Sequence, residues 1–413
     1  MILGQISYLD CVVFLIFLVP QLLLRVNTFE LLSCFFKALP FFRKNLASTH
    51  VAVCFKLMRM VVFYLPYRFI SERYFTPKKQ RSPFVQKASP FQDIVIRCVR
   101  YAFARFPAKI GRVFFSKPVA LPFMRFRMLR HGYLHPPIRW KEISLQNCKG
   151  IWIIYDVARK PDLVIYYCHG GGFSMGSSYF YLEFLLAWAS LLKDNGYQNP
   201  AVFALEYDLV PDAAYPTQLE QTVTGYNHVC TTVDDPSRIC VAGDSAGATL
   251  ILTLLLYIGK QSNSEDQKPG FATLISPWTT LFSSHNRNTA SDFLDASSLH
   301  LYGRQYAGSD EKLNDPLVSP GVCRDVAWWQ KASPTEGYGV LYGSEELLGP
   351  ELRDLIALWR KSGCAVSVRE EPGAIHAWPV ATLFLSDTQA ERQKGLKDLV
   401  KMIRQAIEIQ GDP

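Results

Sequence analysis

From about residue 150 onward, short apolar runs alternate with longer amphipathic stretches along the chain. The apolar runs have the length and composition of β-strands, and they lie at 151–155, 163–168, 201–207, 239–242, 272–276, 339–342 and 366–369. The stretches with helical periodicity lie at 181–193, 218–229, 248–258, 351–362 and 387–409. Strands that are apolar on both faces and alternate with helices predict an α/β fold, with a mostly parallel sheet covered by helices on both faces.

The part of the chain before residue 140 follows a different pattern. It consists of helix-prone stretches that are basic and aromatic and that are interrupted by prolines. We therefore expect three parts: a transmembrane or membrane-anchoring helix in residues 1–25, a basic, aromatic membrane-proximal and cap region over 26–148, and an α/β domain over 149–413.

The first apolar segment is close to the length that a bilayer requires. Residues 2–24 are interrupted by a single charge, Asp10. A cleaved signal peptide fits less well, because no Lys or Arg precedes the run and no clear small-residue cleavage site follows it. A buried helix of a soluble protein is the remaining alternative. A second apolar stretch, 51–65, carries Lys56 and Arg59 and favours an interfacial or cap helix over a span.

The net charge of +8 is distributed unevenly along the chain. Residues 43–141 contain 21 Lys and Arg against only Glu72 and Asp93. The sequence has no zinc-finger, helix-turn-helix or RNP pattern, so we expect this segment to contact anionic membrane lipid and not nucleic acid. Because the basic residues all follow the apolar run, we expect the rest of the chain to lie on the cytosolic side of the membrane. The endoplasmic reticulum is one candidate for that membrane. The ten cysteines form no CxxC pair, and no Asn lies in a glycosylation sequon, which agrees with that side.

The strongest chemical signal is the segment Gly243-Asp244-Ser245-Ala246-Gly247. It follows an apolar strand and precedes a plausible helix, which is the context that a G-x-S-x-G nucleophile elbow requires. In such a turn the serine hydroxyl is exposed at the sheet edge, and the helix amides point toward a developing oxyanion. The alternative is a structural Gly/Ser turn, since the motif alone also occurs by chance.

A second signal, His169-Gly170-Gly171-Gly172, directly follows the predicted strand at 163–168. Three consecutive glycines lose much entropy on ordering, but they allow bare backbone amides to approach a substrate oxygen. This is the pattern of an oxyanion loop, and a flexible turn is the alternative.

Together these two motifs resemble the hormone-sensitive-lipase-like branch of the α/β-hydrolases, also labelled the alpha/beta hydrolase fold-3 group, over about residues 150–410. The segment 207–216 is similar to a Tyr-x-x-x-Pro-x-x-x-(Tyr/Phe)-Pro pattern of that family. The resemblance implies that the amides of Gly171, Gly172 and Ala246 form the oxyanion hole and that His169 braces the loop. It also implies a serine ester hydrolase.

The fold requires the order nucleophile, acid, histidine along the chain. His376 follows the last predicted strand in a segment similar to the family's P-G-x-x-H-(G/A)-(F/W) pattern. A neutral imidazole can take the Ser245 proton and return it to the leaving alcohol. The family's G-x-x-D-x-L pattern aligns with residues 343–348 and places Glu346 on the acid position, where the family usually has Asp. Glu345, one residue away, remains the alternative.

No metal, nucleotide or other cofactor motif competes with this interpretation. The sequence lacks H-E-x-x-H, a P-loop and a strand-associated G-x-G-x-x-G, and chemistry by Ser, His and carboxylate requires no cofactor. The expected substrate is a small lipophilic ester, because a membrane-attached enzyme meets such molecules. Two alternatives stay open: a biosynthetic hydrolase or cyclase acting on a non-ester natural product, and a catalytically silent, small-molecule-binding member of the fold.

Overall fold

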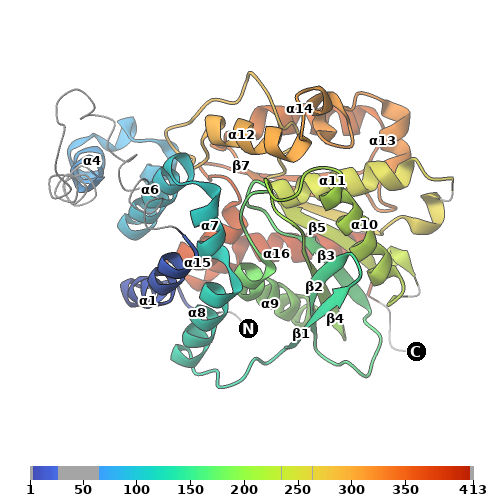
Figure 1. Cartoon of the computed structure of the whole chain (residues 1–413), viewed down its shortest axis with the longest axis horizontal. Helices are drawn as coiled ribbons and strands as arrows, with labels where there is room; N and C mark the ends of the chain where they lie inside the picture. Colours follow the sequence, from blue (N-terminus) through green and yellow to red (C-terminus); the bar gives the residue numbers. More distant parts are fainter. Residues whose placement is uncertain (1–2, 27–64, 234, 263, 410–413) are drawn as a thin grey trace.

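The computed structural model describes residues 3–26, 65–233, 235–262 and 264–409, and its centre is an eight-stranded sheet (Figure 1). The strands are β1 (Arg139–Leu145), β2 (Cys148–Ile154), β3 (Leu163–Cys168), β4 (Pro200–Glu206), β5 (Ile239–Asp244), β6 (Phe271–Ile275), β7 (Tyr338–Gly343) and β8 (Val366–Glu371). Their order is β1-β2-β4-β3-β5-β6-β7-β8. The β1–β2 and β2–β4 pairs are antiparallel and the remaining pairs are parallel. The predicted mostly parallel α/β sheet is confirmed.

Helices cover both faces of the sheet. Successive residues of a strand point to opposite faces, so each strand contributes side chains to two cores. Tyr166 of β3 belongs to the core formed with α10 (Thr217–Cys230), α11 (Ala246–Gly259) and α14 (Gly349–Lys361). Tyr167 points to the other side, into the core formed with α9 (Ser178–Asp194), α15 (Trp378–Leu385) and α16 (Gln389–Ala406). The shorter elements are η5 (Pro236–Arg238), η6 (Ser264–Gln267), α12 (Ala296–Ala307), η7 (Glu311–Asn314), η8 (Pro320–Val322) and α13 (Val326–Ala332).

The sheet begins earlier in the chain than the sequence pattern indicated. Strand β1 lies inside the 26–148 segment, in which no strand was expected. It is an edge strand paired on one side with β2, and most of its side chains reach solvent. An exposed edge strand can be polar, so β1 carries no apolar run by which it could be recognised.

The N-terminal part is helical. It contains α1 (Tyr8–Arg25), α4 (Leu65–Ile70), η3 (Ser71–Phe75), η4 (Lys78–Gln80), α5 (Pro83–Lys87), α6 (Pro90–Arg105), α7 (Ala108–Phe115) and α8 (Lys117–Arg130). Of the second apolar stretch, residues 51–64 lie outside the described residues. Within the described ranges, α1 is the one helix that is long and apolar enough to cross a membrane by length and composition.

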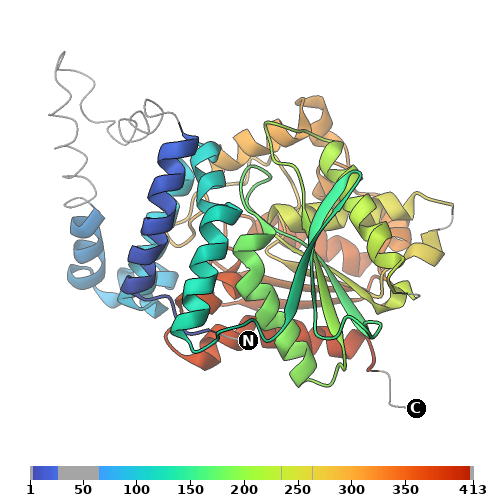
Figure 2. The same cartoon turned by 60° about the horizontal axis from the view of Figure 1, so that its bottom comes forward.

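Helix α1 packs beside α8 on the flank of the α/β domain (Figure 2). Asp10, the charge that interrupts the apolar segment, is buried and pairs with Arg127 at 3.4 Å and with Arg130 at 2.9 Å. Arg127 is also fully buried and forms a bidentate pair with Glu183 of α9, at 2.9 and 2.8 Å. A buried charge is tolerated only where it is paired and hydrogen-bonded, so Asp10 fixes α1 against the domain.

Candidate active site

Ser245 lies in the turn between β5 and α11 with φ 51° and ψ −119°, a backbone conformation that is unfavourable for a residue with a side chain. The flanking glycines have no room for a Cβ atom. A Cβ on Gly247 would lie 2.0 Å from the Cys168 carbonyl oxygen, and one on Gly243 would lie 2.6 Å from the Gly247 carbonyl carbon. The turn is therefore compatible only with glycine at both positions, and it holds Ser245 at the carboxyl end of β5.

Asp244 ties this turn to the glycine loop that follows β3. Its Oδ1 accepts hydrogen bonds from the Gly170 amide at 2.7 Å and from the Tyr167 hydroxyl at 2.6 Å. Its Oδ2 accepts a hydrogen bond from the Tyr181 hydroxyl at 2.7 Å. A Cβ on Gly170 would lie 2.2 Å from Asp244 Oδ2, so the glycine allows this close approach. The Asp244 side chain therefore sets the position of the glycine loop.

Three backbone amides near Ser245 are available to a ligand. Gly171 and Gly172 have positive φ angles of 113° and 61°, and their amides donate no hydrogen bond within the part of the chain that the structure describes. Ala246 is the first residue of α11, where a helix amide has no intrahelical acceptor. These are the three amides that the sequence resemblance assigns to the oxyanion hole.

The ring of His169 lies within the glycine loop and is buried. Its Nδ1 is 2.8 Å from the Gly170 carbonyl oxygen, and the ring stacks on Tyr207 with 4.4 Å between ring centroids. The Tyr207 hydroxyl donates to the His169 carbonyl oxygen at 2.7 Å. Burial lowers the pKa of His169 to about 4, so the ring is neutral at pH 7. These contacts fit the expectation that His169 braces the glycine loop.

His376 follows β8 and Glu346 follows β7, and their side chains face each other. The distance between His376 Nδ1 and Glu346 Oε2 is 3.5 Å, and both side chains are almost fully buried. Neither Nδ1 nor Glu346 Oε1 has a hydrogen-bond partner among the described residues.

Glu345 points elsewhere. Its carboxylate accepts hydrogen bonds from the Ser291 hydroxyl and the Ser344 hydroxyl, each at 3.2 Å. The backbone turn after β7 therefore presents Glu346 to the imidazole and Glu345 to these two serines.

The charges around His376 raise its pKa above the ordinary value of 6.5. Burial is the largest single effect and lowers the pKa, but the facing Glu346 carboxylate together with Asp292 and Asp244 outweighs it. This environment stabilises the imidazolium form of His376.

Backbone contacts connect Ser245 to the histidine loop. The Ser245 amide donates to the Ile275 carbonyl oxygen at 3.0 Å, and the hydroxyl of the next residue, Ser276, accepts from the Ala377 amide at 2.9 Å. Within the described part of the chain the Ser245 and His376 side chains form no direct hydrogen bond. The structure brings the Glu346 and His376 side chains together and holds the Ser245 turn at the end of β5, which β6 separates from β7.

Sequence reasoning did not single out Asp292. This carboxylate is 1% exposed and accepts hydrogen bonds from the His376 amide at 3.1 Å and the Leu347 amide at 2.9 Å. It lies in the irregular segment before α12, where neither periodicity nor a motif distinguishes it from its polar neighbours.

Aromatic side chains from α6, from α12 and from the segment just before α12 lie close to His376 and the glycine loop. Phe293 lies 5.7 Å from His376 between ring centroids, and Phe103 of α6 lies 6.4 Å from Phe293 and 6.0 Å from Tyr302. A Cβ on Gly172 would lie 3.1 Å from the Tyr302 ring. Helix α6 therefore contributes to an apolar surface near the candidate site.

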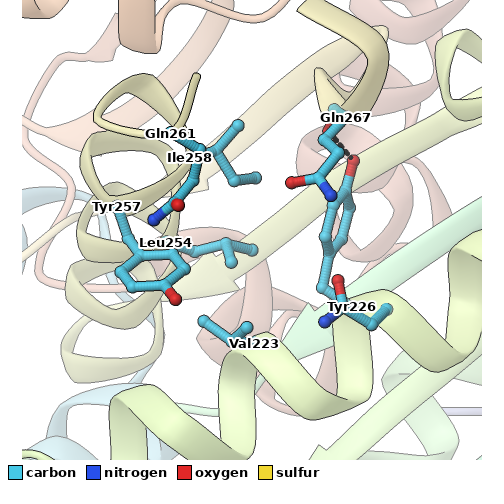
Figure 3. Close-up of a pocket in the computed structure, with 8 residues that line it drawn as sticks. Val223, Tyr226, Leu254, Tyr257, Ile258, Gln261 and Gln267 are labelled. Atoms are coloured by element: carbon cyan, nitrogen blue, oxygen red, sulfur yellow. Dashed lines mark hydrogen bonds between the residues drawn. The ribbon is translucent and has the colours of Figure 1, made fainter. Parts of the chain in front are cut away.

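A cavity between α10 and α11 is separate from the site (Figure 3). Its volume is about 140 Å³, and it is lined by Val223, Tyr226, Asn227, Leu254, Tyr257, Ile258, Gln261 and Gln267. None of the predicted site residues lines it. Within the described ranges, no group of three or more His, Cys, Asp or Glu side chains is arranged to hold a metal ion.

Comparison with known proteins agrees with this architecture. A family model described as alpha/beta hydrolase fold matches residues 165–380, just over half of the chain. The chain therefore belongs to the alpha/beta hydrolase fold family, as its motifs predicted.

Individual relatives place the chain among ester hydrolases. It is 29% identical to an acetyl-hydrolase of Streptomyces hygroscopicus over 57% of this chain and 74% of that protein. It is 26% identical to steryl acetyl hydrolase 1 of Saccharomyces cerevisiae over 47% of each chain, so it spans about half the length of that relative. The crystal structure of an esterase from the bacterial hormone-sensitive lipase family superposes with a TM-score of 0.59 at 23% identity, over 77% of this chain and 99% of that one. The predicted enzyme class, carboxylic ester hydrolase, is confirmed.

Proposed function

We propose that this chain is a serine esterase in which Ser245, His376 and Glu346 form the catalytic triad. The observation that carries the proposal is the facing pair of buried side chains, Glu346 and His376, at 3.5 Å. The strained turn at Ser245, in the same layer of strand ends, supports it further.

The proposed reaction is acyl transfer to water. His376 removes the proton from the Ser245 hydroxyl as its oxygen attacks the ester carbonyl carbon, and Glu346 stabilises the imidazolium that forms. The amides of Gly171, Gly172 and Ala246 donate to the carbonyl oxygen as it becomes negative. The imidazolium then protonates the departing alcohol, which leaves an acyl-enzyme. Water, deprotonated by His376, attacks that acyl group and releases the carboxylic acid and Ser245.

The proposed substrates are acetate or other short-chain esters of lipophilic alcohols, such as a sterol or terpenoid. Two observations support this choice: the aromatic cover contributed by Phe103, Phe293 and Tyr302, and relatives whose names include acetyl-hydrolase and steryl acetyl hydrolase. An apolar wall favours a lipophilic alcohol part over a charged one, because a charged group would lose its hydration there.

We further propose that residues 1–25 attach the enzyme to a membrane, with residues 26–148 as the membrane-proximal and cap region and 149–413 as the catalytic domain. The supporting feature is the outer face of α1, which exposes Leu9, Val12, Leu15, Ile16, Val19 and Leu23 to solvent. Patches of this kind mark interaction surfaces. Because the opposite face is fixed to α8 through Asp10, the outer face is free to enter lipid while the domain stays at the membrane surface.

The membrane proposal is tested by flotation of the purified protein with liposomes that contain anionic lipid. The double variant Leu15→Ser, Ile16→Ser should lose most of its flotation and keep its thermal stability, since both side chains are more than half exposed. Equal flotation of this variant and the wild type would contradict lipid binding through this face.

The enzymatic proposal is tested by hydrolysis of p-nitrophenyl acetate, butyrate and laurate. We expect the wild type to hydrolyse the acetate fastest and Ser245→Ala to lose at least about a thousandfold in kcat. Retention of activity by Ser245→Ala would exclude Ser245 as the nucleophile. If the wild type neither turns over these esters nor reacts with a fluorophosphonate, a silent binding protein or a dedicated biosynthetic enzyme becomes the better interpretation.

A further inference from the structure

A single buried carboxylate connects the loop of the acid to the loop of the histidine. Asp292 Oδ2 accepts a hydrogen bond from the Leu347 amide, the residue after Glu346, at 2.9 Å. Asp292 Oδ1 accepts hydrogen bonds from the His376 amide at 3.1 Å and from the Phe293 amide at 2.8 Å. Both carboxylate oxygens are therefore used to hold backbone, and the two catalytic loops share one anchor.

The segment that carries Asp292 is itself held from outside the α/β domain. Arg100 of helix α6 donates from Nε to the Asp292 carbonyl oxygen at 2.7 Å. Its second terminal nitrogen donates to the Ala290 and Ser291 carbonyl oxygens, at 2.9 and 2.7 Å. One guanidinium thus binds the carbonyl groups of three consecutive residues, a geometry that a lysine cannot reproduce.

We infer that Asp292 is a positioning residue for the Glu346–His376 pair and that Arg100 of the cap region keeps Asp292 in place. The pair is 3.5 Å apart, so a shift of either loop by a few tenths of an ångström decides whether a hydrogen bond forms. Catalysis is sensitive to such shifts, since a displacement of about 1 Å can cost about 100-fold in rate. The inference rests on the proposed triad.

The charge of Asp292 has a second effect on the same ring. Three carboxylates influence the imidazole of His376: Glu346, which faces Nδ1, and Asp292 and Asp244 at longer range. Each favours the imidazolium, so removal of the Asp292 charge destabilises that form as well as loosening the loops.

This arrangement makes the cap region part of the catalytic geometry. Helix α6 supplies both Arg100, which holds the Asp292 segment, and Phe103, which lies near the aromatic cover. A movement of α6 would therefore change the alignment of His376 as well as the shape of the apolar surface.

The test compares Asp292→Asn with wild type in steady-state hydrolysis of p-nitrophenyl acetate across a pH range. We expect kcat to fall by about 10- to 100-fold with KM within about twofold, because alignment and not substrate contact is lost. We also expect the acidic limb of the kcat/KM profile to move to lower pH. A residue that served only to stabilise the fold would not move that limb.

Arg100→Lys is the second variant, and Arg97→Lys is its matched control on the same helix. Arg97 pairs with Asp93 and Glu72 inside the cap region, at 2.7 and 2.6 Å. We expect Arg100→Lys to lower kcat by several-fold at unchanged KM and to leave the acidic limb in place, and Arg97→Lys to keep wild-type kcat.

The inference is overturned if Asp292→Asn keeps the wild-type kcat and pH profile while Ser245→Ala is inactive. If Asp292→Asn does not fold, Arg100→Lys decides: an unchanged kcat overturns the inference, and a reduced kcat at constant KM supports it. Activity in Ser245→Ala would instead contradict the proposed triad itself, so the two failures are distinguishable.

Discussion

The choice between two adjacent glutamates gives a sharp prediction about the triad. Glu346→Gln removes the charge that faces His376 Nδ1 at 3.5 Å, and Glu345→Gln is the matched control one residue away. Glu345 contacts Ser291 and Ser344 and not the imidazole. The two substitutions are chemically identical, so a difference between them reports position alone.

The magnitude follows from the interaction that is lost. At an effective dielectric constant of about 20, two unit charges 3.5 Å apart interact by about 5 kcal/mol. This attraction acts when His376 becomes an imidazolium in the transition state, so its loss lowers kcat by roughly a thousandfold or more. Substitution of Glu345 should change kcat by less than about fivefold, or about 1 kcal/mol.

The assay is steady-state hydrolysis of p-nitrophenyl acetate between pH 5 and pH 9, with thermal unfolding as the folding control. In the wild type, kcat/KM should rise with pH through a midpoint above 6.5, because His376 must be neutral to act as a base and its pKa is raised. In Glu346→Gln the midpoint should move to lower pH. A larger loss in Glu345→Gln than in Glu346→Gln would refute the assignment.

Two further predictions concern stability. Glu183→Gln should lower the free energy of unfolding in urea by about 3–5 kcal/mol, because it leaves the fully buried Arg127 without its bidentate partner, and a loss below about 1 kcal/mol would contradict this account. Burial raises the pKa of Glu206 to about 7 from an ordinary 4.5. Between these two pH values, the folded state keeps a proton on Glu206 that the unfolded state has already released. Stability should therefore fall as pH rises from about 4.5 to about 7, and Glu206→Gln should remove that slope; an unchanged slope in pH-dependent thermal unfolding would show that another group causes it.

The sequence predicted the interior of the α/β domain well, because buried parallel strands are apolar on both faces and so appear as continuous runs. Strand β3 was expected at 163–168 and is observed as Leu163–Cys168. The same reasoning missed β1, whose exposed edge position permits a polar sequence. The division into an anchor, a cap region and a catalytic domain remains a prediction.

Residues at the candidate site were predictable where local geometry restricts the residue type. Gly243 and Gly247 could be found because a Cβ cannot fit in the turn around Ser245. The choice of Glu346 over Glu345 stayed open, since only the backbone path after β7 determines which side chain faces His376. Asp292 and Arg100 were not predictable, because their roles depend on contacts between segments that are distant in sequence, such as the hydrogen bond between Asp292 and the His376 amide.

The position of the covalent adduct that a fluorophosphonate forms would show whether Ser245 is the nucleophile of an esterase. The wild-type protein would be treated with a fluorophosphonate, digested, and analysed by mass spectrometry alongside a measurement of residual p-nitrophenyl acetate hydrolysis. We expect one modified residue, Ser245, with activity lost in proportion to labelling. Modification of a different residue, or full hydrolysis after stoichiometric labelling of Ser245, would show that Ser245 is not the nucleophile.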